Sequence, residues 1–278
     1  VTSISEAAFS GCSNLKDIYY TGSPSQWKQI SIGSNNNEFR RATVHYVKFG
    51  ENLKWSFDKE TGTLTISGTG EMYAFNYAKE FPWHGERSEI TSVVLEEGVT
   101  NIGGSAFYGC TNLVNVVIPS SVTSIGNSAF SGCTGLSSVS IPNSVTSIGS
   151  YAFSGCTALT SLKIPEGVTT IAGYTFDSCT NLTSISIPNS LTSIVKNAFK
   201  DCTSLKKIYY SGTPSEWDQI NIELNGNYNY VIGEASIHYA RCGKNVDWSF
   251  DKKAGTLTIS GNGAIEDIDK KDCTPWHD

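Results

Sequence analysis

Apolar residues recur along most of the chain with a strict period of 23 residues. Five units run from 90 to 112, 113 to 135, 136 to 158, 159 to 181 and 182 to 204, and a sixth begins at Leu205. Each unit follows the pattern L-x-x-V-x-I-P-x-x-V-T-x-I-G-x-x-A-F-x-x-C-T-x. So short a segment cannot bury these apolar positions within itself, so neighbouring units must stack them into columns. The pattern therefore predicts an elongated solenoid in which one unit forms one coil.

Within a unit, the apolar positions predict two short extended segments and a turn. Alternation predicts a strand in which Val139 and Ile141 point inward and Ser140 points outward. The segment 145–148 has apolar residues at both ends and predicts a second extended segment, and the Ala-Phe pair at 152–153 fills the interior from a short helical or irregular turn. A proline ends the first strand because it lacks an N–H donor, and it recurs at Pro119, Pro142, Pro165 and Pro188.

A second, longer period is superimposed on the first. Residues 1–30 match residues 191–220 at an offset of 190, with 17 of 30 positions identical. After a slip of three residues, 45–68 match 238–261 at an offset of 193, with 16 of 24 identical. The chain therefore holds about one and a half copies of a large unit.

Each large unit also contains segments outside the repeat. A polar turn followed by Pro214 predicts a short capping helix that places Trp217 on the open end of the stack. The segment 55–68, repeated at 248–261, predicts a β-hairpin around a glycine-containing turn, and 81–84 is expected to lead into the next array and cover its first coil. The predicted organisation is the end of a first array with its cap (1–46), a β-hairpin linking module (47–89), a repeat array with a C-terminal cap (90–240) and a second, truncated hairpin module (241–278).

The composition narrows the classes of partner. Charged residues make up only 17% of the chain, so Ser, Thr, Asn and Gly must supply much of the polar surface. The net charge is −6 and no Lys/Arg cluster occurs, which argues against a nucleic-acid partner. No apolar run approaches the ~18 residues of a spanning helix, so no membrane insertion is predicted for this fragment. The pattern is interrupted at both ends, so we expect a fragment of a longer protein whose export signal and anchor lie outside it.

The repeated unit I-P-x-x-V-T-x-I-G-x-x-A-F-x-x-C-T-x-L resembles the BspA-like class of leucine-rich repeats over 90–210 and 1–20. The flanking segment W-S-F-D…G-T-L-T-I-S-G-T-G…P-W-H is similar to a module that accompanies such arrays in surface proteins of gut and oral anaerobic bacteria. The resemblance implies a mainly β leucine-rich repeat solenoid with short helical turns and small β-hairpin capping modules. It also implies an extracellular or bacterial cell-surface location and a role in adhesion to host matrix proteins. No catalytic residues come with the family.

The cysteines are predicted to be structural. Five of them occupy the same place in successive coils and would form one column of small, buried free thiols: Cys110, Cys133, Cys156, Cys179 and Cys202. Stacked side chains point the same way rather than toward each other, and no C-x-x-C pair suggests zinc. Cys242 and Cys273 fall where the first copy has Phe49 and Glu80, so they are outside the shared pattern and a bridge between them stays open.

No catalytic, cofactor or metal site is predicted. The four histidines are two positions each present twice, which favours structural roles: His45, His84, His238 and His277. The 60 residues from Gly103 to Leu162 contain no Asp, Glu, Lys, Arg or His, so most of the array cannot perform acid/base chemistry. An alternative reading places His84, beside Trp83, in the wall of a groove.

The outer face of the first strand is the best candidate for binding. In the last coil Leu205, Ile208 and Tyr210 are expected to point inward, which leaves the intervening side chains outside. A continuous sheet face of this kind is what solenoids commonly use for binding. The candidate residues are Ser140, Lys163, Ser186, Lys206, Lys207 and Tyr209, with Lys16 and Tyr19 repeating the arrangement in the first array.

Three functional readings follow. The first is an adhesion module that binds a host extracellular protein or glycan, and the alternative is a structural stalk that presents other domains. A threonine column at positions 123, 146, 169 and 192 is reminiscent of ice-binding solenoids, but each coil lacks the regular outward pair of threonines. The open edge of the first coil, at Val1, also predicts end-to-end self-association.

Overall fold

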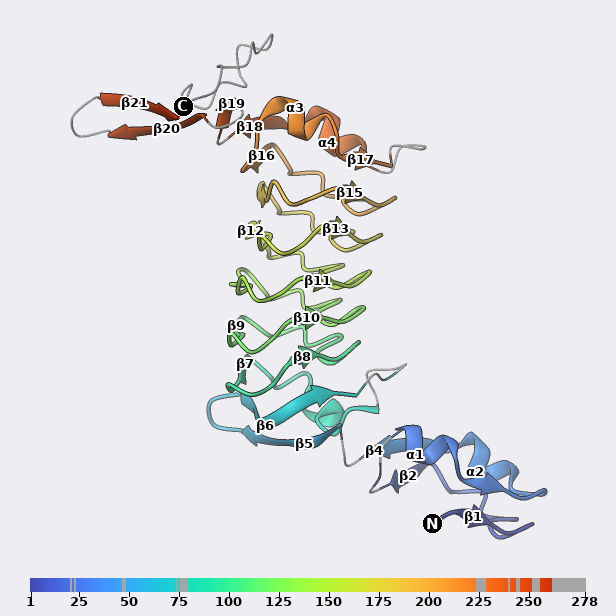
Figure 1. Cartoon of the computed structure of the whole chain (residues 1–278). Coiled ribbons are helices and arrows are strands. Elements are labelled where there is room, and N and C mark those ends of the chain that lie inside the picture. The colour runs from blue at the N-terminus through green and yellow to red at the C-terminus, as the bar shows by residue number, and fades with distance from the viewer. Residues whose placement is uncertain are drawn as a thin grey trace.

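The computed structural model shows an elongated stack of coils that starts on a β-hairpin and ends under a helical cap, with a smaller coiled unit at the N-terminal end (Figure 1). It describes residues 1–20, 22, 24–46, 49–73, 75, 80–223, 229–239, 241–243, 246–251 and 256–261. Most of its elements are short strands, and its helices span five residues or fewer among these residues. The predicted fold, a mainly β solenoid with short helical turns, is confirmed.

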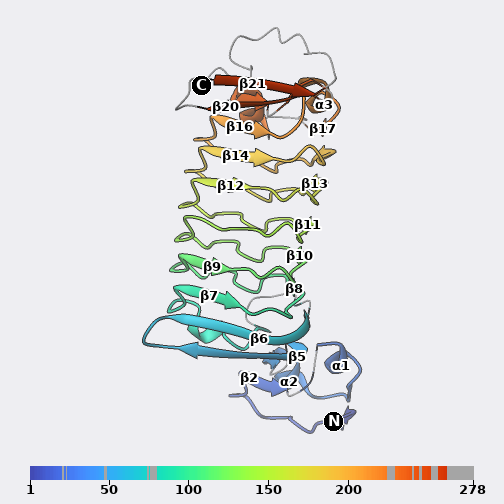
Figure 2. The same cartoon turned by 60° about the vertical axis from the view of Figure 1, so that its left-hand side comes forward.

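The first extended segment of each coil builds a parallel ladder along one side of the stack (Figure 2). Its strands are β7 (Ser92–Leu95), β9 (Asn115–Val117), β12 (Ser161–Lys163), β14 (Ser184–Ile187), β16 (Lys207–Tyr210) and β18 (Ser236–Tyr239). The predicted strand at 139–141 is wrong: this coil forms no strand, and it separates the sheet that ends at β9 from the sheet that starts at β12. Its serines offer little side-chain packing to a sheet, yet Ile141 is buried as predicted. Burial of the inward residues, rather than strand pairing, keeps this coil in line.

The second extended segment forms two-residue strands that also pair in parallel. These are β8 (Asn101–Ile102), β10 (Ser124–Ile125), β11 (Ser147–Ile148), β13 (Thr170–Ile171), β15 (Ser193–Ile194) and β17 (Asn221–Ile222). Serine and threonine hydroxyls reinforce the stack next to these strands: Ser144 donates to the Val122 carbonyl at 2.7 Å and Thr123 to the Thr100 carbonyl at 3.1 Å. The hydroxyl-rich composition therefore has a structural use between coils, and the threonine column spends hydroxyls on neighbouring backbone.

The turn on the third side is hydrogen-bonded from coil to coil as well. The Phe107 N–H donates to the Ala129 carbonyl at 2.8 Å, and the bond repeats from Phe130 to Ala152 at 2.8 Å. Each turn places one residue that is not glycine in the left-handed region, with φ between 56° and 65°: Ser105, Ser128, Tyr151, Tyr174 and Asn197. Small polar residues tolerate this conformation better than bulky ones, so the two tyrosines are exceptional.

Aromatic rings and thiols fill the interior. One phenylalanine from each coil lies in a continuous column, with neighbouring ring centroids 5.3 to 5.8 Å apart: Phe107, Phe130, Phe153, Phe176 and Phe199. All five rings are almost completely buried. The cysteine column lies beside them and is likewise buried from Cys110 onward.

A β-hairpin closes the N-terminal end of the main stack. Its strands are β5 (Gly50–Asp58) and β6 (Thr63–Met72), and β6 continues the first ladder by pairing in parallel with β7. Trp83 precedes the 3₁₀ turn η2 (His84–Glu86), donates its indole N–H to the Ala106 carbonyl at 2.8 Å and stacks on Phe107. The segment 81–84 covers the first coil, as predicted.

A helical coil closes the other end. The helix α3 (Pro214–Trp217) starts at a capping box between Thr213 and Glu216, and Trp217 packs on the stack as predicted. After β17, the helix α4 (Tyr230–Glu234) leads into β18. A second hairpin follows, with β19 (Arg241–Gly243), β20 (Val246–Asp251) and β21 (Thr256–Gly261).

A buried asparagine terminates the ladder of the turns. The Phe199 N–H has no further coil to donate to, and the Asn229 Oδ1 accepts it instead at 3.1 Å. The Asn229 Nδ2 donates to the Val195 and Glu223 carbonyls, both at 3.1 Å. Asn229 therefore replaces the backbone of a missing coil.

The N-terminal unit repeats this cap. Its elements are β1 (Ser3–Ile4), β2 (Asp17–Tyr20), α1 (Pro24–Lys28), β3 (Ser31–Ile32), α2 (Asn37–Arg41) and β4 (Thr43–Tyr46). Here the Phe9 N–H donates to Asn36 Oδ1 at 2.9 Å, just as Phe199 donates to Asn229. Phe9 and Phe199 are 190 residues apart whereas Asn36 and Asn229 are 193 apart, which places the three-residue slip between β3 and α2. The long period is therefore a repeat of three-dimensional structure.

Candidate functional site

Outward side chains of the second sheet form two columns on one face of the stack (Figure 2). The strand register places Lys163, Ser186, Tyr209 and His238 in one column and Ser161, Ser184, Lys207 and Ser236 in the other. We call these eight residues, together with Lys206, the sheet face. Adjacent strands bring neighbours in a column within side-chain contact, so the face is continuous across four coils.

Most of the sequence-predicted site residues lie on this surface. Lys163, Lys206, Lys207 and Tyr209 are exposed, and Ser186 is half-buried between Lys163 and Tyr209. The inward residues Ile208 and Tyr210 are buried, so the predicted alternation in this coil is confirmed. Ser140 is exposed but lies in the coil that forms no strand, outside the sheet. Lys16 and Tyr19 are exposed on the N-terminal unit and do not join the other candidates.

His238 was missing from the predicted site. Its ring stacks on Tyr209 with centroids 5.1 Å apart and the planes 29° from parallel. Tyr209 remains 38% exposed. The sequence signal was available, because the corresponding residues of the first copy, Tyr19 and His45, are also in register on β2 and β4. The sheet face thus combines an aromatic pair with three lysines.

The column cysteines are free thiols held by the backbone. The Cys156 Sγ donates to the Phe130 carbonyl at 3.2 Å, and Cys133, Cys179 and Cys202 repeat the bond. Burial raises the pKa of Cys156 to about 12, and it raises the pKa of Cys110 to about 12 as well. The predicted structural role is confirmed for these cysteines, whereas a bridge between Cys242 and Cys273 lies outside the described residues.

We expect the buried column thiols to resist alkylation at pH 8 while the exposed Cys12 reacts, as measured by peptide mass spectrometry after iodoacetamide treatment. Because the folded pKa of Cys156 lies above its ordinary value of 9.0, stability should be complete below pH 9 and fall as the pH rises toward 12. Urea unfolding at pH 8 and pH 10.5 measures this loss. Alkylation of Cys156 at the rate of Cys12 would contradict the prediction.

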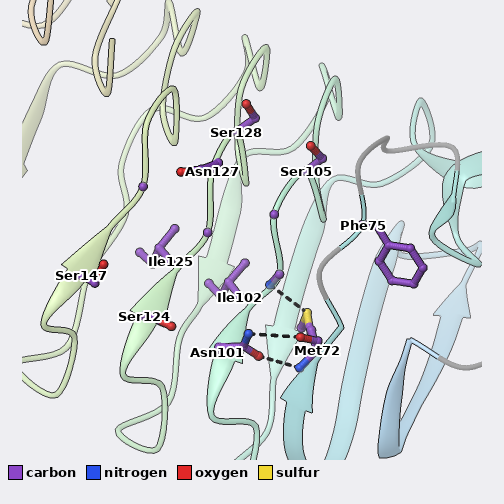
Figure 3. A pocket seen from close by; sticks show the side chains of 14 residues that line it. Met72, Phe75, Asn101, Ile102, Ser105, Ser124, Ile125, Asn127, Ser128 and Ser147 are labelled. Atoms are coloured by element: carbon purple, nitrogen blue, oxygen red, sulfur yellow. Dashed lines mark hydrogen bonds between the residues drawn. The ribbon is translucent and has the colours of Figure 1, made fainter. Parts of the chain in front are cut away.

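An open groove of about 590 Å³ lies on another side of the stack, beside β8, β10 and β11 (Figure 3). Outward serines of the strands, Ser124 and Ser147, line one wall, and the turn residues Ser105 and Ser128 line the other. Its floor is bare backbone at a glycine column, because a Cβ on Gly126 would lie 2.6 Å from the Gly104 nitrogen. Met72 and Phe75 line one end. The sequence analysis did not anticipate this groove.

Two further observations concern other classes of site. Within the described residues, no three His, Cys, Asp or Glu side chains group together as metal ligands would. His84 is half-buried, and its ring lies 3.2 Å from the Arg87 guanidinium at Nε2. None of the helices among the described residues has the length and apolar character needed to cross a bilayer.

Comparison with known proteins supports a repeat family. A family model described as "BspA type Leucine rich repeat region" matches residues 1–56 and 85–206 in six copies. The structure of a leucine-rich repeat protein from Eubacterium ventriosum is 32% identical with a TM-score of 0.53, over 59% of this chain and 43% of that chain. One from Bacteroides ovatus is 30% identical with a TM-score of 0.45, over 59% and 47%. The chain therefore spans less than half the length of either protein. No curated protein matches the sequence.

Proposed function

The chain belongs to the BspA-type leucine-rich repeat family, and on that premise we propose that it is a non-enzymatic adhesion module of a bacterial cell-surface protein. In this proposal the sheet face binds an extracellular protein of the host. The observation that carries the proposal is the continuous column in which Lys163, Ser186 and Tyr209 follow one another in register.

The chemistry of the sheet face favours a protein partner with acidic groups. Lys163 and Lys207 are the charged outward residues of β12, β14 and β16, and no Asp or Glu occurs in these three strands. Tyr209 supplies a large side chain with an apolar ring and a polar tip, the type of residue that often dominates protein interfaces. Its stacking on His238 holds the ring in place before a partner arrives, which reduces the entropy lost on binding.

Binding is tested on immobilised fibronectin, fibrinogen, laminin, collagen, mucin and sulfated glycans. We expect saturable binding to one of the proteins, weakened by salt because the lysines contribute by charge. Changing Lys207→Ala and Tyr209→Ala together should weaken it by about tenfold or more, since an interface anchor contributes at least about 1–2 kcal/mol.

The control is Tyr151→Ser, which removes a ring of similar exposure from another side of the stack and should leave this binding unchanged. Full affinity in the double variant would place the site elsewhere on the chain. Binding to a sulfated glycan alone would replace the protein partner by an anionic one.

The structure also motivates the stalk as a second candidate function. The hairpin of β20 and β21 repeats the pairing of β5 and β6, in which Thr63 faces Asp58 and Thr256 faces Asp251. Such a module, which closes one array after the cap of another, suits a chain of tandem units. A silent binding panel would favour this function over adhesion.

A further inference from the structure

The groove beside β8, β10 and β11 is a second surface with its own chemistry. Its volume of about 590 Å³ falls within the range of small-molecule sites, and it extends across three successive coils (Figure 3). Hydroxyls reach it from both walls, through Ser124 and Ser147 on the strands and Ser105 and Ser128 on the turns. The site is therefore a polar trough that runs along the stack.

The trough contains no charge. Its lining consists of Ser, Asn, Gly, Ile, Met and Phe residues, and the sequence from Gly103 to Leu162 has no ionisable Asp, Glu, Lys, Arg or His. An anionic ligand would find no cation there, and a cationic ligand would find no carboxylate. The lining thus selects an uncharged ligand that carries many hydroxyls.

An exposed aromatic ring stands where the trough ends. Ser105 and Ser128 occupy the left-handed position of their turns, and in the next coil the same position holds Tyr151, two residues after the lining residue Gly149. Tyr174 covers one face of the Tyr151 ring, with centroids 4.6 Å apart and the planes 7° from parallel. On the other side the column continues with the small Ser128, and Tyr151 is 41% exposed.

From these features we infer that the trough binds a neutral oligosaccharide, with its chain along the coils and one sugar ring against Tyr151. A sugar combines hydroxyls with an apolar ring face, which matches serine walls that end at an aromatic platform. Neighbouring coils are about 4.8 Å apart, so each sugar unit of an extended chain meets a fresh set of serine hydroxyls. The inference does not depend on the function proposed for the sheet face.

The test is calorimetric titration of the whole chain with cellohexaose, maltohexaose, mannohexaose and, as a charged comparator, hexagalacturonate. Tyr151→Ser restores the residue type of the preceding coils at this left-handed position, so the variant should fold. Ser147→Tyr fills the trough from an exposed strand position. Tyr209→Ala is the matched control on the sheet face, and thermal melting checks that each variant is folded.

We expect at least one neutral hexaose to bind, and Tyr151→Ser and Ser147→Tyr each to weaken it by about tenfold or more while Tyr209→Ala leaves it unchanged. Three results would overturn the inference: no binding by any neutral hexaose, full affinity in either trough variant, or preferential binding of hexagalacturonate. Because the control variant reports on the sheet face, failure here and failure of the adhesion proposal are distinguishable.

Discussion

Replacing Phe153 by alanine is expected to lower the free energy of unfolding by about 3–5 kcal/mol. The ring is fully buried and lies between Phe130, at 5.4 Å, and Phe176, at 5.8 Å. Backbone hydrogen bonds on the turn fix the spacing of the coils, so the neighbours cannot close over the cavity. The full transfer and cavity cost should therefore appear in urea unfolding followed by circular dichroism.

The position of Phe153 in the stack adds a second readout. Each coil is supported only by its neighbours, so a weak coil in the middle should uncouple the two halves of the array. We expect a less steep urea transition in Phe153→Ala as well as a lower midpoint. The control is Tyr151→Ser in the same coil, whose exposed side chain should change stability by less than about 1 kcal/mol. A loss below about 1 kcal/mol in Phe153→Ala would contradict the stacked-column account.

The sequence was sufficient to predict the coil because each part of the coil recurs. Phe153 and Cys156 fill the same interior positions in every unit, so alternation and period together identify the inward residues. The strand at 139–141 was the exception. There the inward pattern is kept but the strand pairing is not, because burial constrains a coil more strongly than the local preference for extended structure does.

The candidate sites were harder to predict because outward residues carry no periodic constraint. Strand alternation was enough to place Lys207 and Tyr209 outside, but not to show that His238 stacks on Tyr209. The trough depends on what the glycine column leaves empty, and a motif of repeated letters does not report empty space. Tyr151 became a candidate only when its left-handed backbone and its stacking on Tyr174 were seen together.

The cap asparagines show a different limit of sequence reasoning. Asn36 and Asn229 lie in polar segments where asparagine usually indicates a turn, and both are completely buried in the structure. Their only sequence signal is that each recurs at the offset of 193. The function of such a residue depends on a backbone N–H about 30 positions away, as the Phe199 bond to Asn229 shows.

Replacing Asn229 by alanine is expected to cost about 3 kcal/mol, because it leaves three buried backbone groups without their partner. These are the Phe199 N–H and the carbonyls of Val195 and Glu223. The Asn229→Asp variant keeps an acceptor for the Phe199 N–H but removes the amide donor, so it isolates the two carbonyl bonds and should also be destabilised.

The matched control for Asn229 is Asn221→Ala, which removes the same side chain from an exposed position of the same cap. It should change the free energy of unfolding by less than about 0.5 kcal/mol. Hydrogen exchange gives the site-specific readout: the Phe199 amide should lose protection in Asn229→Ala, while the Phe130 amide, which donates to the Ala152 carbonyl inside the stack, stays protected. Since coils depend on their neighbours, the last coil should then open before the rest. Equal stability of the two alanine variants would show that water or a shift of the cap replaces Asn229, and the ladder would not need a side chain to end it.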